Sequence, residues 1–277
     1  MGRSALVALC LVASAAASPP APRVSLFPAE RAREIHFIRH AEGHHNVATR
    51  EAGGSNDPLL RGDRPAAECA LYDARLTPAG VEQCRALRRR LRADGKLSSF
   101  DLVVVSPFTR TLETAMHVFG EPPAGGEDGA PPTLDAGVAY VVREECRERW
   151  GLYVCDGRRP MREITADRAL AAGFDFSGVA DDDDARYEDA REPDDACCAR
   201  AARFLEWLSR RPEKRIAVVT HSSFLRHLLM QFGDGLSPAD AEALRAPVGN
   251  CELRSVVLCS HGALEAEDRQ EEEGAVA

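Results

Sequence analysis

Three short apolar runs in this chain each lead into basic or histidine side chains. The runs and the residues that follow them are 35–38 with Arg39 and His40, 102–105 with Arg110, and 216–219 with His221. Short apolar runs rich in Ile and Val are typical of strands buried in a parallel sheet. In open α/β sheets, ligands bind outside the carboxyl ends of such strands. We therefore expect the two arginines and two histidines to meet in one pocket suited to an anion.

Helical patterns separate these runs. Residues 77–93 begin with Thr77, a good N-cap, which is followed by a proline that suits the first helical position. Apolar residues recur at helical spacing there and in three further segments, one after Arg110, one before the third apolar run and one after His221. Strands that alternate with helices predict an α/β fold with a mostly parallel, doubly wound sheet.

The chain of 277 residues is acidic, with a formal net charge of −9. This balance argues against a nucleic-acid binder that holds its ligand through a general basic surface. The acid is concentrated at residues 181–184 and 265–273, and such blocks are usually solvated or disordered. The arginines near the expected pocket are therefore local binding groups rather than part of a bulk positive charge.

The amino-terminal residues have the pattern of a secretory signal. Residues 1–18 combine Arg3, an apolar segment at 5–12 and small residues that suit cleavage. The apolar segment is too short for a stable membrane-spanning helix, so we expect no stable membrane insertion. The predicted organisation is a signal peptide at 1–18, one domain at 19–264 and an acidic tail at 265–277. It implies a secreted or endomembrane-routed protein, with organelle targeting left open.

The cysteines set few constraints. The chain has nine, of which Cys10 would leave with the signal. The others permit disulfides in a secreted protein, but their pairing cannot be read from the sequence. No Cys-x-x-Cys pair supports a structural zinc site. For Cys84, which lies on the apolar face of its expected helix, burial is the simpler interpretation.

The expected pocket has the composition needed to transfer a phosphoryl group. Neutral imidazole can form a covalent phosphoryl intermediate, and the charged fork of arginine suits nonbridging oxygens. A carboxylic acid or a similar group at the rim of the pocket must also protonate the leaving oxygen, and residues 143–148, after the apolar run 138–142, offer candidates. A zinc site of His40, His44 and His45 is the weaker interpretation, because no carboxylate or thiolate set completes it. We therefore expect no metal.

Several motifs together resemble one family. In chain order they are Arg39-His40 with Asn46, like an Arg-His-Gly signature and its following Asn; 73–80, like a Leu-Thr-x-x-Gly helix start; 106–115, like a second arginine motif; Cys146-Arg147-Glu148; 155–159; Val219-Thr220-His221, like a second histidine motif; and 250–255. With them the chain resembles the histidine phosphatase superfamily, and within it the phosphoglycerate mutase-like branch of plants, algae and fungi. The likeness runs from residue 35 to residue 258 and implies a three-layer α/β sandwich.

The resemblance implies a two-step phosphoryl transfer that needs no cofactor. His40 would become the phosphohistidine. The implied phosphate-binding residues are Arg39, Asn46, Arg110 and His221, the last of which also has a catalytic role. Glu148 is the favoured acid, and Glu144 remains the alternative because the spacing from Glu148 to Gly151 is one residue shorter than the common family pattern. Ala41 stands where the family usually has glycine.

The favoured function is phosphomonoester hydrolysis on a phosphorylated small molecule. One alternative is a mutase, which would return the phosphoryl group to its substrate, and another is a silent phosphate-binding module. The substrate would be selected by residues 47–72 and by an excursion at 156–195. Arg158 and Arg159 fit either a contact with a second phosphate or ion pairs at the surface. The sequence does not specify the oligomeric state.

Overall fold

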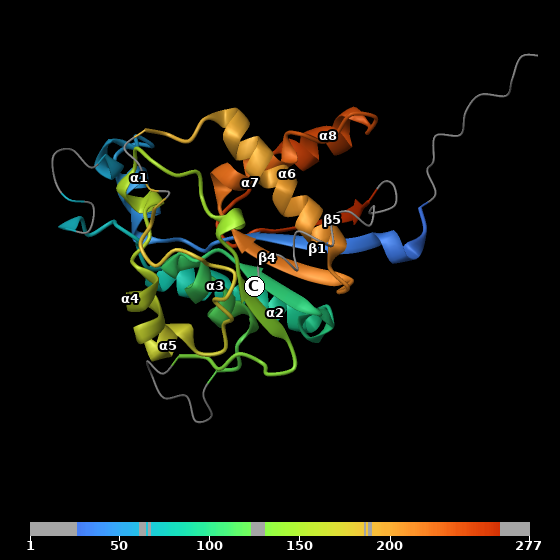
Figure 1. Ribbon diagram of the computed structural model, residues 1–277, viewed down its shortest axis with the longest axis horizontal. Helices are drawn as coiled ribbons and strands as arrows, with labels where there is room; N and C mark the ends of the chain where they lie inside the picture. Colours follow the sequence, from blue (N-terminus) through green and yellow to red (C-terminus); the bar gives the residue numbers. More distant parts are fainter. Residues whose placement is uncertain are drawn as a thin grey trace, which may run out of the picture.

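The computed structural model describes residues 27–60, 65, 68–122, 131–185, 187 and 190–260. These residues form a five-stranded sheet with strand order β3-β2-β4-β1-β5 (Figure 1). The strands are β1 (Ala32–Arg39), β2 (Leu102–Val105), β3 (Ala139–Val142), β4 (Arg215–Thr220) and β5 (Leu253–Cys259). The first four run parallel, and β5 is antiparallel to β1. The mostly parallel sheet predicted from the sequence is confirmed.

Helices cover both faces of the sheet and produce three layers (Figure 1). One face carries α2 (Pro78–Ala93) and α3 (Thr109–Phe119), and the other carries α6 (Asp194–Arg210) and α7 (Ser222–Leu229). The remaining helices are α1 (His44–Glu51), α4 (Met161–Ala166), α5 (Arg168–Ala171), α8 (Pro238–Arg245) and the 3-10 helices η1 (Ala29–Arg31), η2 (Asp57–Leu59), η4 (Leu97–Ser99), η5 (Glu144–Cys146) and η6 (Val154–Asp156). The four helices predicted from apolar spacing are α2, α3, α6 and α7.

The central strands are apolar because both of their faces are covered. All of β2 is buried. Val103 and Val105 pack against the core beneath α2 and α3, whereas Leu102 and Val104 pack against the core beneath α6 and α7. Successive side chains of a strand point to opposite faces, so one short run contributes to two cores.

The start of α2 packs closely on the segment that follows β1. Thr77 is its N-cap, as predicted, and its Oγ1 accepts a hydrogen bond of 3.0 Å from the Gly80 N–H. A Cβ at Gly80 would lie only 2.1 Å from the carbonyl oxygen of Glu42. Glycine at this position lets the helix fix the loop after His40 through backbone contact.

The acidic run at 181–184 is not the solvated block that we expected. The Asp184 side chain is 5% exposed and accepts hydrogen bonds of 2.6 and 2.8 Å from Arg147. The backbone carbonyl oxygens of the three preceding aspartates accept from Arg158. The expectation was wrong for Asp184 because two buried guanidinium groups need acceptors, and this run supplies them.

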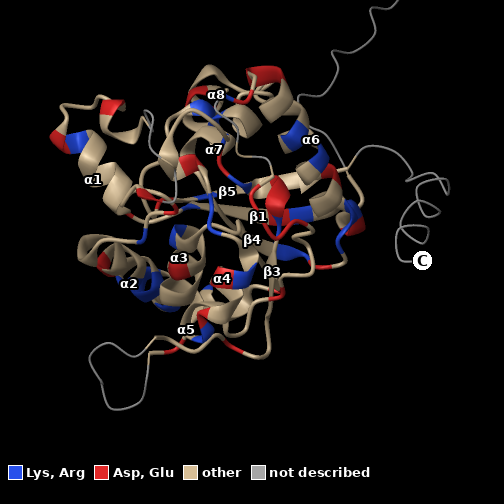
Figure 2. Ribbon diagram, turned by 60° about the vertical axis from the view of Figure 1, so that its left-hand side comes forward, with Lys and Arg blue, Asp and Glu red and all other residues tan. Residues whose placement is uncertain are grey.

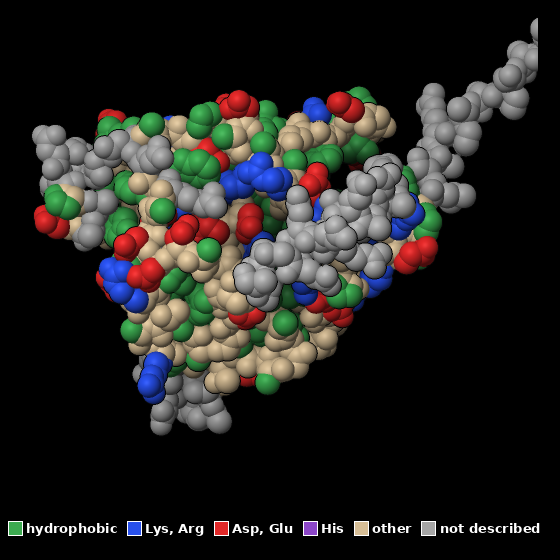
Figure 3. All heavy atoms as spheres, in the orientation of Figure 1, with side chains coloured by type: hydrophobic (Ala, Val, Ile, Leu, Met, Phe, Trp, Pro, Cys, Tyr) green, Lys and Arg blue, Asp and Glu red, His purple; other side chains and the backbone are tan. Residues whose placement is uncertain are grey.

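Both chain ends fall outside the described residues, including the predicted signal peptide at 1–18 and the acidic tail at 265–277. Among the helices that the structure describes, none is long and apolar enough to cross a membrane. Basic and acidic residues share the same helices, as α2 and α6 show in Figure 2. On the face in Figure 3, blue and red side chains likewise lie beside one another.

Candidate active site

The carboxyl ends of the parallel strands bring the predicted site residues together. The register of β1 and β4 pairs Arg39 with Thr220. The next residues, His40 and His221, therefore lie side by side, with ring centroids 5.2 Å apart. Arg110, in the first turn of α3, is close enough to lower the pKa of both rings further after burial has done so. The two arginines and two histidines thus meet at one edge of the sheet, as predicted.

His40 is held as a neutral ring, and no described residue donates a hydrogen bond to its Nε2. The residue is 1% exposed, and its Nδ1 lies 2.8 Å from the carbonyl oxygen of Ala41. Because a carbonyl oxygen only accepts, Nδ1 carries the proton and Nε2 keeps its lone pair. Burial, followed by the charge of Arg110, lowers the pKa of His40 well below its ordinary value. Nε2 is therefore available as a nucleophile.

Several groups around His40 keep a buried nitrogen without a hydrogen-bond partner among the described residues, and three of them are Arg39, Arg110 and His221. Arg39 and Arg110 each donate one Nη1 hydrogen bond of 2.9 Å to a backbone carbonyl oxygen. His221 Nε2 lies 2.8 Å from Ser106 Oγ. Within the described part of the chain, Nε of each arginine and Nδ1 of His221 have no hydrogen-bond partner. Since buried polar atoms are nearly always paired, these atoms indicate a site for an anion.

Asn46 and Asn250 fix the turn that follows the nucleophile. Asn250 Nδ2 donates to the carbonyl oxygen of His40 at 3.1 Å and to Asn46 Oδ1 at 3.2 Å. The same Oδ1 accepts from the Gly43 N–H at 3.0 Å. The Oδ1 of Asn46, a residue predicted to assist the phosphoryl group, thus holds the loop. Asn250 belongs to one of the quoted motifs, but we assigned it no role from the sequence.

His45 also belongs to the pocket, although from the sequence we considered it only as a zinc ligand. Its ring centroid lies 5.3 Å from that of His40, and the residue is 6% exposed, whereas His44 is exposed. Adjacent helical residues lie about 100° apart, so only one of this pair can face the nucleophile, and the sequence does not say which. Among the described residues, no group of three His, Cys, Asp or Glu is arranged to hold a metal ion.

Glu144, the alternative acid, belongs to a buried ion-pair network. Its carboxylate accepts from Arg147 at 2.6 Å and from Arg158 at 3.3 Å. Arg158 also donates to the carbonyl oxygens of the acidic run, and Arg159 Nε donates to Asp73 at 3.1 Å. Both residues are therefore in ion pairs, but that of Arg158 is buried and not at the surface as we expected.

The carboxylate of Glu148, the favoured acid, contacts the first turn of α7, the helix that follows His221. Its carboxylate accepts from the backbone N–H groups of Ser223 at 3.2 Å and Phe224 at 2.9 Å. Burial lowers the pKa of Arg39, and the negative charge of Glu148 opposes that effect. Glu148 therefore lies near the arginine that precedes the nucleophile, and its described hydrogen bonds come from backbone amides rather than from arginine.

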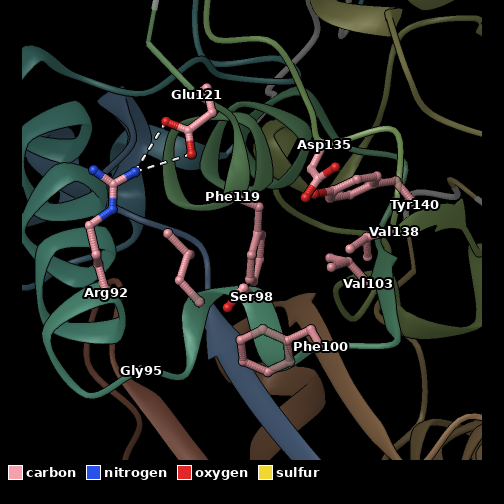
Figure 4. Close-up of a pocket in the computed structure, with 11 residues that line it drawn as sticks. Arg92, Gly95, Ser98, Phe100, Val103, Phe119, Glu121, Asp135, Val138 and Tyr140 are labelled. Carbon is pink, nitrogen blue, oxygen red and sulfur yellow. Dashed lines mark hydrogen bonds and ion pairs between the residues drawn. The ribbon is translucent and has the colours of Figure 1, made fainter.

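A separate cavity of about 190 Å³ lies toward the amino-terminal end of β2. It is lined by Arg92, Gly95, Leu97, Ser98, Phe100, Val103, Phe119, Glu121, Asp135, Val138 and Tyr140. Figure 4 shows Phe100, Phe119 and Tyr140 around it, with Arg92 paired to Glu121 at one side. Its lining has no histidine or cysteine and its arginine is paired, so we assign it no chemistry.

Comparisons with known proteins agree with the fold and the motifs. The family model of the histidine phosphatase superfamily (branch 1) matches residues 35–125 and 130–267. The Phosphoglycerate mutase-like protein of Arabidopsis thaliana is 36% identical over 87% of this chain and 90% of its own length. Phosphoglycerate mutase-like protein 2 of the same plant is 35% identical over 86% of this chain and 77% of its own length.

One solved structure shows the same fold. The ecdysone phosphate phosphatase of Bombix mori superposes with a TM-score of 0.50 at 17% identity, covering 84% of this chain and 96% of its own. The family match extends over most of this chain, and the resemblance stated from the motifs is confirmed. The chain belongs to branch 1 of the histidine phosphatase superfamily.

Proposed function

We propose that this protein hydrolyses phosphomonoesters of small molecules through a phosphohistidine on His40, without a metal ion. The observation that carries the proposal is the set of unpaired buried nitrogens around a neutral His40. Among the described residues, Arg39 Nε, Arg110 Nε and His221 Nδ1 have no hydrogen-bond partner, and in this proposal they bind the anion that His40 Nε2 attacks. Two permanent positive charges at the site supply the charge that phosphoryl transfer requires.

The first step forms the phosphoenzyme. The Nε2 lone pair of His40 attacks phosphorus, and the ester P–O bond breaks. The leaving oxygen takes a proton from the Glu148 carboxylic acid, because an alkoxide is a poor leaving group. Arg39 and Arg110 bind the nonbridging oxygens. We assign the acid to Glu148 because Glu144 is engaged by Arg147 and Arg158.

The second step returns the enzyme to its starting state. The Glu148 carboxylate takes a proton from a water molecule, and the water oxygen attacks phosphorus. The P–N bond breaks, its electron pair returns to Nε2 of His40, and inorganic phosphate leaves. Glu148 is then protonated again for the next substrate.

Hydrolysis fits the site better than mutase transfer does. A mutase holds its dephosphorylated product until the phosphoryl group returns, which needs a second binding site for an anionic product. Arg158 and Arg159, the candidates from the sequence, already donate to protein oxygens. The full set of arginines and histidines also favours an enzyme over a silent binding module.

The test is phosphate release from an aryl phosphate by the full chain, with and without a chelator. We expect chelator-resistant release that is lost in His40→Ala and retained in His44→Ala, which changes an exposed neighbour. Rapid acid-free quenching should trap a phosphohistidine in the wild type. Turnover that persists in His40→Ala would show that the nucleophile is wrong. Transfer of phosphate to a second hydroxyl compound in preference to water would favour the mutase.

A further inference from the structure

His45 is the pocket histidine to which the proposed reaction assigns no step. It is the second residue of α1, and its buried ring lies 5.3 Å from the ring of His40. Burial lowers the pKa of His45, and the charges of Arg110 and Arg39 lower it further. The ring is therefore neutral and lies close to the arginines that would hold a phosphoryl group.

Gly43 makes room for this ring. The backbone of Gly43 has φ −102° and ψ 164°, a conformation that any residue adopts. A Cβ there would lie 2.9 Å from both Nδ1 and Cε1 of His45, which is closer than van der Waals contact. Glycine is thus needed for the position of the His45 ring rather than for the turn itself.

The proton of the neutral His45 ring belongs on Nε2. Its Nδ1 is buried, and the described residues place no acceptor or donor against it. A proton on Nδ1 would therefore be a buried N–H without an acceptor, which is costly. His40 has the opposite arrangement, because the Ala41 carbonyl oxygen holds its Nδ1 proton. One ring thus presents a bare Nε2, and the other presents an Nε2–H.

We infer that His45 is a further phosphoryl-binding residue, which donates its Nε2–H to a nonbridging oxygen of the group transferred to His40. This inference rests on the proposed function. A neutral donor adds a hydrogen bond where charge develops without placing a third positive charge beside the nucleophile. The His45 imidazole lies between the backbone of Gly43 and the ring of His40.

The test compares two substitutions that differ in the donor. His45→Gln keeps an amide N–H at similar reach, whereas His45→Met fills the space without a donor. Orthovanadate, which imitates the pentacoordinate phosphoryl group, is titrated against the full chain and each variant. We expect its Kd to rise about 10- to 100-fold in His45→Met, as for a lost hydrogen bond to a charged group, and to stay within about threefold in His45→Gln. The kcat/KM for an aryl phosphate should follow the same order.

Controls separate binding from folding and from the failure of the proposed function. His44→Met changes the exposed neighbour and should leave both measurements unchanged. Melting temperatures show whether each variant is folded. Equal losses in folded His45→Gln and His45→Met, or no loss in either, would overturn the donor role. If the wild type binds vanadate but releases no phosphate, the hydrolytic function fails while the vanadate series still decides on His45. If the wild type does not bind vanadate, both proposals are wrong.

Discussion

Arg110 and Arg158 are equally buried, each 1% exposed, yet their surroundings are opposite. All three nitrogens of Arg158 donate to protein oxygens, including Glu144 and the carbonyls of the acidic run. Arg110 gives one hydrogen bond to the Cys155 carbonyl, while its Nε has no partner among the described residues. A buried cation that donates no hydrogen bond to a carboxylate destabilises the fold unless a ligand compensates. The difference distinguishes an arginine that holds the protein together from one kept for an anion.

The largest expected effect is the loss of catalytic activity when Arg110 is replaced. Arg110→Met should lower kcat/KM for an aryl phosphate about 10²- to 10³-fold, because it removes a charged donor to the transferred group. The free energy of unfolding should change by no more than about 1 kcal/mol, since one hydrogen bond is lost and an unpaired buried charge is removed. Steady-state kinetics and urea unfolding measure the two quantities. Full activity in a folded variant would contradict the assignment.

Arg158→Met should have the reverse profile. The variant should lose about 3–5 kcal/mol of unfolding free energy, because buried acceptors lose their charged partner. The kcat/KM of the folded fraction should change less than about tenfold. Arg162→Met is the matched control, since Arg162 pairs with the same acidic run but is 59% exposed. It should cost no more than about 1 kcal/mol. If Arg158→Met and Arg162→Met lost the same unfolding free energy, the burial and the hydrogen bonds of Arg158 would not be the source of its contribution to stability.

The sequence was sufficient for three of the parallel strands, for the four helices that cover the sheet, and for the meeting of His40, Arg39, Arg110 and His221. It did not predict the antiparallel strand β5 or the shorter helices. Apolar runs indicate buried strands, and the ends of parallel strands lie at one edge, so residues that follow them meet without further information. The hydrogen-bond and ion-pair partners of a buried arginine cannot be predicted in this way, because they come from segments distant in the sequence. Nothing local to Arg158 shows that the carbonyls of residues 181–183 accept from it.

Two features of the site that the sequence did not specify depend on the orientation of side chains. Glu144 and Glu148 lie within one short segment, but η5 turns the chain so that one carboxylate meets two arginines and the other meets the start of α7. His44 and His45 are adjacent, and only the exact start of α1 determines which one is buried. The types and spacing of the residues do not specify which of two neighbouring side chains faces the site.

Glu148→Gln and Glu144→Gln extend the comparison to the two carboxylates. A missing acid slows departure of a poor leaving group more than of a good one. Glu148→Gln should therefore lower kcat by a factor of about 10² or more for an alkyl phosphate. For a nitrophenyl phosphate the factor should be about ten times smaller. Glu144→Gln should reduce stability, because Arg147 and Arg158 lose a buried charge partner, and should leave the ratio of the two rates unchanged. A ratio that shifts in Glu144→Gln instead would transfer the acid role to Glu144.

The smallest expected effect is a displacement of the pH profile. His40 must be neutral to attack, and burial followed by Arg110 lowers its pKa below 6.5. Activity should therefore persist as the pH falls through 6.5 and decline only below it. In Arg110→Met the charge is gone but burial remains, so the acid limb of kcat/KM should move toward 6.5 without reaching it. In Arg158→Met it should not move, because Arg158 is not among the main influences on the pKa of His40. The same aryl phosphate is used for the wild type and both variants, so the ionisation of the substrate affects all three pH profiles equally. If the acid limb of kcat/KM shifted equally in Arg110→Met and Arg158→Met, the charge of Arg110 would have no particular effect on the pKa of His40.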